Sequence, residues 1–326
     1  MRVEVITSEP VLRALCPEWS ELLDRCPYAT PFQSPEWLLP WWRHFGSGSL
    51  RVVAARTADT LVGLFPLYVE NGRILLIGSG ITDYLDVLVD PAFEHDALAA
   101  MFGVLLQCKG DWETAQFGEL RPASPLLNAA IPGELVSFSS AASVCPFLTL
   151  PGTPDDFYAA LSYRQRRHIR SAKKKASETY LLELSLAQSR TLPAYLDDLF
   201  RLHNSRWNER NMPGVLSDEA IQRFHRDAME GFLDKGWLYL YGLKFDGVTV
   251  ASIYAIRRNE RLFGYLGGFD PAHHRFSPGM LALSLVFEDA ICKGVQEFDF
   301  LRGREAYKYA WGAHDRTTYA LTLSRS

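Results

Sequence analysis

The densest group of side chains able to do chemistry lies near the C-terminus, in the run EFDFLRGREAYKYAWGA. Asp299 falls inside the predicted strand 297–301, where a phenylalanine flanks it on each side. Burial among apolar neighbours raises the pKa of a carboxyl group, which makes Asp299 a candidate general base. The alternative is a structural carboxylate that pairs with Arg302 or with Lys308.

Two more candidates follow in a short segment of helical pattern, 305–311. Tyr307 is a candidate general acid, because a phenol can protonate a leaving thiolate. Lys308 is a candidate for holding a phosphate or orienting an acceptor, since an ammonium group offers three donors. The alternative for Tyr307 is a place in the core, on the same helix face as Trp311.

The segment HRFSPGMLAL has the composition of a helix start that binds an anion. Ser277 suits the N-cap of the predicted helix 279–293, and Pro278 suits its first turn. Free backbone N–H groups at a helix start attract anions, and here they belong to Gly279, Met280 and Leu281. Arg275 adds a charge-assisted contact to a phosphate. The alternative is that Ser-Pro-Gly only caps a buried helix.

Other polar residues are candidates for binding the acceptor of a transferred group. One group lies near a helix end in HNSRWNERN and consists of His203, Arg206 and Trp207. Another lies in GITDYLDVLVD, where paired carboxylates favour an amine, and consists of Asp83, Tyr84 and Asp86. Arg302 is a further candidate contact to the substrate. The alternative for His203 is a structural histidine.

A helix predicted from residue 155 to 176 carries a run of basic residues. They are Arg164, Arg166, Arg167, Arg170, Lys173, Lys174 and Lys175. A charge run on a helix is usually a solvated face. A phosphate-bearing substrate, a tRNA acceptor stem or an anionic membrane surface are the functional alternatives.

Helical and strand patterns alternate along the chain, which predicts a mixed α/β fold. A weak repeat lies in this order: hairpin turns at 71 and 259, Asp-Pro-Ala at 90 and 270, and strands ending in Leu-Arg at 120 and 301. The offsets are 188, 180 and 181 residues (71 to 259, 90 to 270, 120 to 301). With a turn-rich stretch at Pro151–Pro154, the repeat predicts two tandem domains, 1–152 and 153–326. The first copy has EHDALAA in place of Ser-Pro-Gly, so we expect its acids to repel an anion and that half to be inactive.

Composition narrows the class of protein. The 326 residues carry a net charge of −4, so nucleic-acid binding would need a local basic patch. The five cysteines are scattered and no metal-ligand spacing occurs, so we expect reduced thiols, no metal and a cytoplasmic location. A signal peptide, a membrane span and the GxSxG, P-loop and GxGxxG motifs are not expected, because no segment has the pattern for them.

Several phrases together resemble the CelD-like branch of the GNAT acyltransferases, which is associated with cellulose and exopolysaccharide synthesis. They are PFQSPEWLLPWWRHFG, DYLDVLVD, YRQRRHIRSAKKKA, HNSRWNERN, GYLGGFDPAHHRFSPGMLAL and EFDFLRGREAYKYAWGA. The layout is similar to that of FemAB-type tandem GNAT transferases. The resemblance implies a mixed sheet with helices on both faces in each half, with acetyl-CoA or a longer acyl-CoA as donor. It places phosphate binding at Arg275–Met280 and the general acid at Tyr307.

The resemblance and the residues together predict an N-acyltransferase that acts on an amino sugar, an amino acid or a long-chain base. Asp299 would deprotonate the amine, and the strand near Gly267, Gly268 and Phe269 would supply an oxyanion donor. One alternative is a FemAB-like transferase that uses charged tRNA. Another is a non-catalytic partner in a polysaccharide-assembly complex. Association with a membrane surface or with a polysaccharide synthase is a further expectation.

Overall fold

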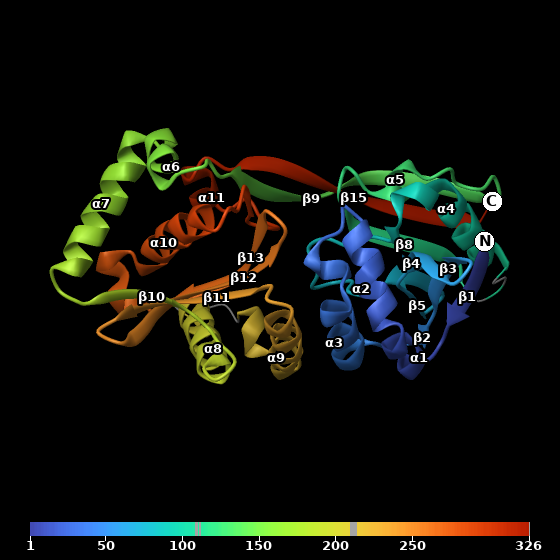
Figure 1. Cartoon of the computed structure of the whole chain (residues 1–326), viewed down its shortest axis with the longest axis horizontal. Helices are drawn as coiled ribbons and strands as arrows, with labels where there is room; N and C mark the ends of the chain where they lie inside the picture. The colour runs from blue at the N-terminus through green and yellow to red at the C-terminus, as the bar shows by residue number, and fades with distance from the viewer. Residues whose placement is uncertain (108–109, 111, 209–213, 326) are drawn as a thin grey trace. The chain divides into compact units, whose positions relative to one another are not determined.

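The computed structural model describes residues 1–107, 110, 112–208 and 214–325, apart from the side chains of Arg206 and Asn208. Cys108 therefore lies outside the described residues. The chain divides into two compact units (Figure 1), of which unit 1 holds 1–144 and 316–326 and unit 2 holds 145–315. The boundary thus precedes the expected residue 152. The last eleven residues belong to unit 1, although the sequence placed them in the second domain.

Unit 1 contains two sheets. Its helices are α1 (Glu9–Ala14), α2 (Cys16–Arg25), α3 (Pro35–Phe45), α4 (Glu94–Gln107) and α5 (Pro125–Asn128), with the 3-10 turns η1 (Pro31–Gln33) and η2 (Pro91–Phe93). One sheet has the order β1 (Arg2–Ile6), β3 (Val52–Thr57), β4 (Thr60–Phe65), β7 (Leu88–Val89). The other has the order β15 (His314–Arg325), β8 (Thr114–Leu120), β6 (Arg73–Leu76), β5 (Leu67–Glu70), β2 (Ser49–Leu50). Strands β6 and β8 are parallel.

Unit 2 is built on one sheet. Its helices are α6 (Pro154–Ala160), α7 (Tyr163–Ser177), α8 (Leu192–Asn208), α9 (Glu219–Asp234), α10 (Pro278–Cys292) and α11 (Ala306–Ala310), with the turns η3 (Val215–Ser217) and η4 (Pro271–Phe276). The strand order is β10 (Leu182–Leu186), β11 (Leu238–Phe245), β12 (Val248–Arg258), β13 (Arg261–Phe269), β14 (Glu297–Asp299), then the end of β9 (Leu135–Thr149). The expected mixed α/β fold is confirmed.

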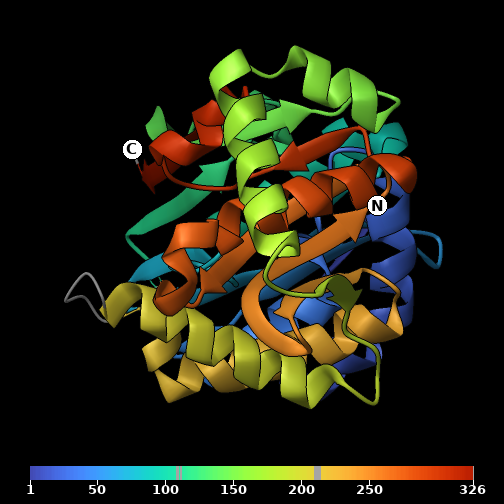
Figure 2. The ribbon, with the colours of Figure 1, turned by 90° about the vertical axis from the view of Figure 1, so that its left-hand side faces the viewer.

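Helices cover both faces of the unit 2 sheet: α7, α10 and α11 on one, α8 and α9 on the other. Helix α10 buries residues around most of its circumference, since the sheet lies on one side and α7 on the other. Ala172 and Ala176 let α7 approach closely at Leu281 and Ala282. Figure 2 shows α7 crossing in front of α10.

The repeat in the sequence corresponds to a repeat of structure. Each hairpin turns at an asparagine with positive φ, 49° at Asn71 and 54° at Asn259. Asp90 and Asp270 then cap equivalent 3-10 turns by accepting the N–H of the residue two positions on, at 3.1 and 3.0 Å. A helix and a strand parallel to the hairpin's second strand follow in both units.

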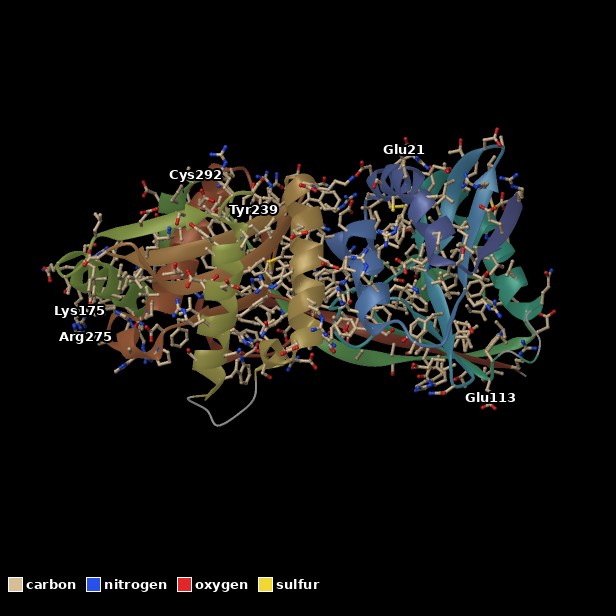
Figure 3. All side chains as sticks on the ribbon, turned by 90° about the horizontal axis from the view of Figure 1, so that it is seen from below. Glu21, Glu113, Lys175, Tyr239, Arg275 and Cys292 are labelled. Carbon is tan, nitrogen blue, oxygen red and sulfur yellow. The ribbon has the colours of Figure 1, made fainter. Side chains whose placement is uncertain are left out.

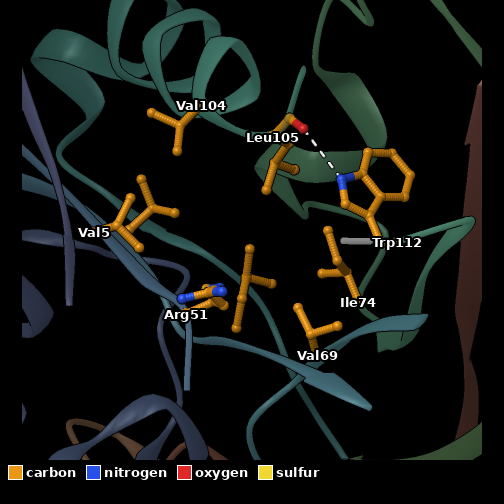
Figure 4. A pocket seen from close by; sticks show the side chains of 9 residues that line it. Val5, Arg51, Val69, Ile74, Val104, Leu105 and Trp112 are labelled. Carbon is orange, nitrogen blue, oxygen red and sulfur yellow. Dashed lines mark hydrogen bonds between the residues drawn. The ribbon is translucent and has the colours of Figure 1, made fainter. Parts of the chain in front are cut away.

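Unit 1 also contains a small apolar cavity, which Figure 4 shows from close by. It has a volume of about 20 Å³ and is lined by aliphatic side chains such as Val5, with Arg51 and Trp112. The indole N–H of Trp112 is already used, because it donates to the carbonyl of Leu105 at 3.1 Å. A space that holds about one water and has no convergent polar groups is a packing defect rather than a substrate site.

Candidate functional site

The candidate site of unit 2 begins where two parallel strands diverge. Strand β14 pairs with β13 only from Arg261 to Phe263, while β13 continues to Phe269. The ring of Phe298 packs over Gly264 on one face of the sheet, since a Cβ on Gly264 would be 2.6 Å from its Cζ. The register shift opposite Tyr254 and Ala255 makes Tyr265 a bulged residue. Beyond Phe263 one edge of β13 therefore has no β14 partner for its backbone groups.

The backbone of α8 covers part of β13 on one face of the sheet. A Cβ on Gly268 would lie 2.3 Å from the backbone nitrogen of His203 and 2.4 Å from the carbonyl carbon of Leu202. Only glycine allows this approach. The candidate oxyanion donors at Gly267–Phe269 thus have α8 against one face, and the strand edge remains for a ligand.

The N-terminus of α10 differs in detail from the expected N-cap. Ser277 has φ of 51°, and its side chain makes no capping hydrogen bond. Its hydroxyl instead lies 3.3 Å from Nε2 of His168 on α7. The first intrahelical bond runs from the Leu281 N–H to the Ser277 carbonyl, so the expectation that Leu281 offers a free N–H is wrong. Gly279 and Met280 precede that bond, and their N–H groups stay available to an anion.

The surroundings of this helix start are cationic. Arg275 is exposed and stacks on its neighbour Phe276, with 4.5 Å from Cζ to the ring centroid. Lys175 of α7 is exposed at the same end of unit 2, as Figure 3 shows. Gly279 has a packing reason as well, because a Cβ there would lie 3.1 Å from Cδ1 of Phe269.

Asp299 is fully buried on β14. Its Oδ1 accepts the N–H of Leu301 at 2.8 Å. Leu301 has φ of 57°, so the strand ends at Asp299 rather than at the predicted residue 301. Strand alternation places Asp299 on the face opposite Phe298, which belongs to the core under α10. The carboxylate therefore belongs to the α8 face of the sheet.

Lys308 is 2% exposed and holds the loop after β14 together. Its Nζ donates to the carbonyls of Leu301, Arg302 and Gly303 at 3.1, 2.8 and 3.0 Å, and it lies 2.9 Å from the Glu305 carboxylate. These four acceptors use all three ammonium protons. The geometry gives Lys308 a positioning role and leaves no donor for a phosphate, contrary to the expectation from the sequence.

Tyr307 and Trp311 have different environments, although both were placed on one helix face. Trp311 is 2% exposed and belongs to the core, while Tyr307 is 41% exposed. The Tyr307 ring packs edge-on against Phe300, with centroids 6.2 Å apart. The Tyr307 side chain is thus partly accessible from solvent.

The predicted acceptor residues on α8 form part of a buried cluster. Trp207 donates its indole N–H to Nε2 of His203 at 3.0 Å, which fixes His203 as an imidazole with the proton on Nδ1. The side chain of Arg206 lies outside the described residues. His225, which the sequence analysis did not single out, packs on Tyr254 and Tyr265 with centroids 5.8 and 5.2 Å away. Burial lowers the pKa of His225 to about 3, and nearby His203 contributes. The cluster is therefore neutral at pH 7.

The other predicted acceptor group lies inside unit 1. Asp83, Tyr84 and Asp86 are 8%, 1% and 6% exposed. Asp86 Oδ1 accepts the hydroxyl of Ser124 and the N–H of Val87, each at 2.9 Å. Burial raises the pKa of Asp86 to about 7. Tyr84 and Asp86 contact other residues of unit 1, and the burial of all three side chains gives no support to the prediction that they face a substrate.

The sequence predicted neither a metal site nor a membrane-spanning helix. Within the described ranges, no group of three or more His, Cys, Asp or Glu side chains is arranged to hold a metal ion. Among the helices that the structure describes, none is both long and apolar enough to cross a bilayer.

Comparison with known proteins assigns the class. Residues 163–309 match the family model described as acetyltransferase (GNAT) domain. The matched segment contains the diverging strands and the α10 N-terminus. The chain thus carries a GNAT domain and is a GNAT-type acyltransferase.

Solved structures share the fold over nearly the whole chain. The crystal structure of FemX has a TM-score of 0.69 at 10% identity and covers 98% of this chain and 97% of its own. The C-terminal domain of a putative lysylphosphatidylglycerol synthetase from Agrobacterium fabrum has 0.59 at 11%, covering 95% and 91%. L-PGS from Bacillus licheniformis has 0.56 at 13%, covering 90% and 92%. No curated protein matches the sequence. At these identities the likeness shows the fold alone, and the CelD-like branch stays a prediction.

Proposed function

We propose that unit 2 transfers an acyl group from a CoA thioester to a primary amine. The observation that carries this proposal is the helix start at Gly279 and Met280, next to the edge of β13 that β14 leaves unpaired. Its N–H groups suit the pyrophosphate of CoA, since a helix N-terminus favours anions. Arg275 and Lys175 add positive charge at the same end of the unit. The thioester would then lie along the β13 edge.

The reaction needs one proton removed and one proton supplied. Asp299, directly or through a water molecule, accepts a proton from the amine, whose nitrogen attacks the thioester carbonyl carbon. A backbone N–H in the stretch Gly267–Phe269 stabilises the tetrahedral oxyanion. The C–S bond then breaks, and Tyr307 protonates the departing thiolate. Lys308 keeps the loop between Asp299 and Tyr307 in place.

The neutral cluster on α8 and α9 bears on the acceptor. His203, Trp207 and His225 add no net charge, so the charge offered to an amine on this face of the sheet is that of the proposed base, Asp299. An amino sugar, an amino acid or a long-chain base fits this description. The resemblance of the sequence to the CelD-like branch is our reason for proposing a role in exopolysaccharide or envelope synthesis.

The donor is tested by calorimetric titration with acetyl-CoA and a long-chain acyl-CoA. We expect micromolar binding by the wild type and a loss of at least about tenfold in Arg275→Glu, because a charge-assisted phosphate contact becomes repulsive. The matched control is Arg190→Glu, which reverses an exposed charge elsewhere in unit 2. Failure of the wild type to bind any acyl-CoA would reject the proposal and point to charged tRNA as the donor or to a non-catalytic partner role.

The acid is tested with two tyrosines of α11. Tyr307→Phe is expected to lower kcat by about 100-fold, the usual contribution of a positioned acid. Tyr309→Phe is the control, because the Tyr309 hydroxyl is bound to the Asp315 carboxylate at 2.7 Å. Equal turnover in the two variants would remove Tyr307 from the mechanism.

A further inference from the structure

The basic helix α7 presents two different faces. Its buried stripe, which packs on the core of unit 2, consists of Ile169, Ala172 and Ala176. The opposite stripe follows the spacing i, i+4, i+7, i+11 and consists of Tyr163, Arg167, Arg170 and Lys174. All four are exposed, so this stripe faces solvent along the whole helix. We call it, together with Arg164, the α7 face.

The cations of the α7 face are largely uncompensated. Other basic residues of the helix are used internally: Arg166 donates to the carbonyls of Ala159 and Leu161 at 2.8 and 2.7 Å, and Lys173 lies 3.7 Å from Glu288. On the α7 face, Lys174 lies 3.7 Å from Glu178. Arg164, Arg167 and Arg170 have no ion-pair partner in the part of the chain that the structure describes. A chain with a net charge of −4 thus concentrates unpaired positive charge on one helix face.

Large apolar side chains are exposed at both ends of this face. Tyr163 at the start of α7 is 72% exposed, and Leu181, just beyond its end, is 75% exposed. Val248 is 64% exposed and follows the turn whose Asp246 N–H donates to the Leu181 carbonyl at 3.0 Å. Figure 2 views this side of unit 2, with α7 and the segment that leads to β10 in front.

We propose that the α7 face docks on the surface of a bilayer that contains anionic lipids. The arginines contact lipid phosphates, while Tyr163 and Leu181 enter the headgroup region, where amphipathic and apolar side chains are favoured. The exposed apolar residues favour a lipid surface over RNA. RNA phosphates would contact the cations but would make no contact with Leu181 or Val248. The negative charge of the rest of the chain is repelled by the same surface, which favours docking through this face. The proposal concerns where the enzyme works and does not depend on the acyl donor.

Sedimentation of the full chain with lipid vesicles tests the proposal. We expect binding to phosphatidylcholine vesicles that contain phosphatidylglycerol, weaker binding at high salt, and none to phosphatidylcholine alone. The double variant Arg167→Glu/Arg170→Glu should bind at least about 30-fold more weakly, because two attractive charges become repulsive. The control Arg2→Glu/Arg190→Glu makes the same change in net charge at exposed positions elsewhere, and its binding should stay within about threefold of wild type.

A second pair of variants separates lipid from RNA. Tyr163→Ser/Leu181→Ser keeps every charge, so we expect it to weaken vesicle binding several-fold and to leave any binding of tRNA unchanged. Binding of tRNA without binding of anionic vesicles would overturn the proposal in favour of a nucleic-acid partner. Equal vesicle binding by the charge-reversal pair and its control would overturn it too, as would failure of the wild type to bind vesicles. Acetyl-CoA titration of the same variants reports independently on the donor site.

Discussion

The two units build the same succession of elements and differ in the strand that borders the candidate site. In both, a hairpin leads through an Asp-capped 3-10 turn and a helix to a parallel strand. Near the end of that strand a residue has φ of 57°: Glu119, inside β8 of unit 1, and Leu301, two residues after β14 of unit 2. Non-glycine residues with positive φ are uncommon, so their occurrence near the end of both strands is consistent with a duplicated origin.

The difference lies in what fills the gap between the diverging strands. In unit 2, β13 is continuous from residue 261 to 269. In unit 1 the equivalent strand is divided into β6 and β7, and residues 77–87 lie between them. This inserted segment reaches the end of β8, where the Leu85 N–H donates to the Glu119 carbonyl at 3.2 Å. Unit 1 thus places its own chain at the end of β8, whereas we propose that a ligand lies at the corresponding edge of unit 2.

The helix that follows shows the same division of roles. Helix α4 has Glu94 and Asp96 in its first turn, and a hollow of about 90 Å³ beside it is lined by Glu94 and His95. Helix α10 has no acidic residue in its first turn. Carboxylates at a helix start compete with a bound anion, so the start of α10 suits the proposed anion site better than the start of α4 does.

The largest effect is expected from a change that breaks the close contact between α8 and β13 in unit 2. Gly268→Ala puts a methyl group against the backbone of α8, at 2.3 Å from the His203 nitrogen. We expect a loss of about 4 kcal/mol, above the usual cost of overpacking, because helix backbone cannot move aside like a side chain. Gly118→Ala on β8 is the control, since no described atom lies within 4 Å of its Cβ position. Equal urea midpoints would show that α8 moves freely on β13.

A smaller loss is expected from the lysine that holds the unit 2 loop. Lys308→Met removes the ammonium from three loop carbonyls and from Glu305. The buried carbonyls lose their donor, so we expect unfolding to become easier by about 3 kcal/mol. Lys174→Met changes a lysine whose side chain is 75% exposed, and it should cost little. Identical stability of the two variants would contradict the positioning role.

In unit 1, the loop after β8 is held by the buried carboxyl group of Asp86, which accepts the hydroxyl of Ser124. Burial disfavours the charged form of this group. Burial raises the pKa of Asp86 to about 7, against about 4 in an unfolded chain. The folded form therefore keeps its proton to higher pH than the unfolded form. This group favours the folded state most below about pH 4, and the benefit is lost as pH rises from about 4 to about 7.

Asp86→Asn removes the charge but keeps an oxygen for Ser124 and Val87. We expect the variant to be more stable than wild type by about 2 kcal/mol at pH 8, and nearly equal to it near pH 4. Urea unfolding at both pH values measures this, with the exposed Asp59→Asn as control. A variant that is less stable at pH 8 would mean that Arg121 requires the charged carboxylate.

Patterns local in the sequence predicted most of the elements, the mixed fold and the repeat. These local patterns could not predict features that depend on residues far apart in the chain. The last strand joins unit 1 because it pairs with β8, some 200 residues earlier, and no local pattern states that pairing. The first strand of the unit 1 hairpin is interrupted between β4 and β5. Pro66 lies at this break and was a local signal for it.

The candidate site divides in the same way. The helix start at Pro278 could be predicted because a proline in the first turn acts locally, although Ser277 does not make the expected capping bond. The use of Lys308 by loop carbonyls was not, because a lysine beside a carboxylate has the same sequence whether it binds a ligand or its own backbone. His168 beside Ser277 was also missed, since the two lie 109 residues apart.

The smallest effect is expected from variants that test whether the two 3-10 turns, η2 and η4, contribute equally to stability. Asp90→Ala and Asp270→Ala each remove one capping hydrogen bond, so each should cost about 1 kcal/mol. Asp90 should cost a few tenths more, because its carboxylate also accepts from Arg25 at 2.7 Å. Asparagine at either position keeps the cap and should restore most of the loss. If only one of the two alanine variants lowers the urea midpoint, the turns are not energetically equivalent, and the duplication survives in backbone geometry alone.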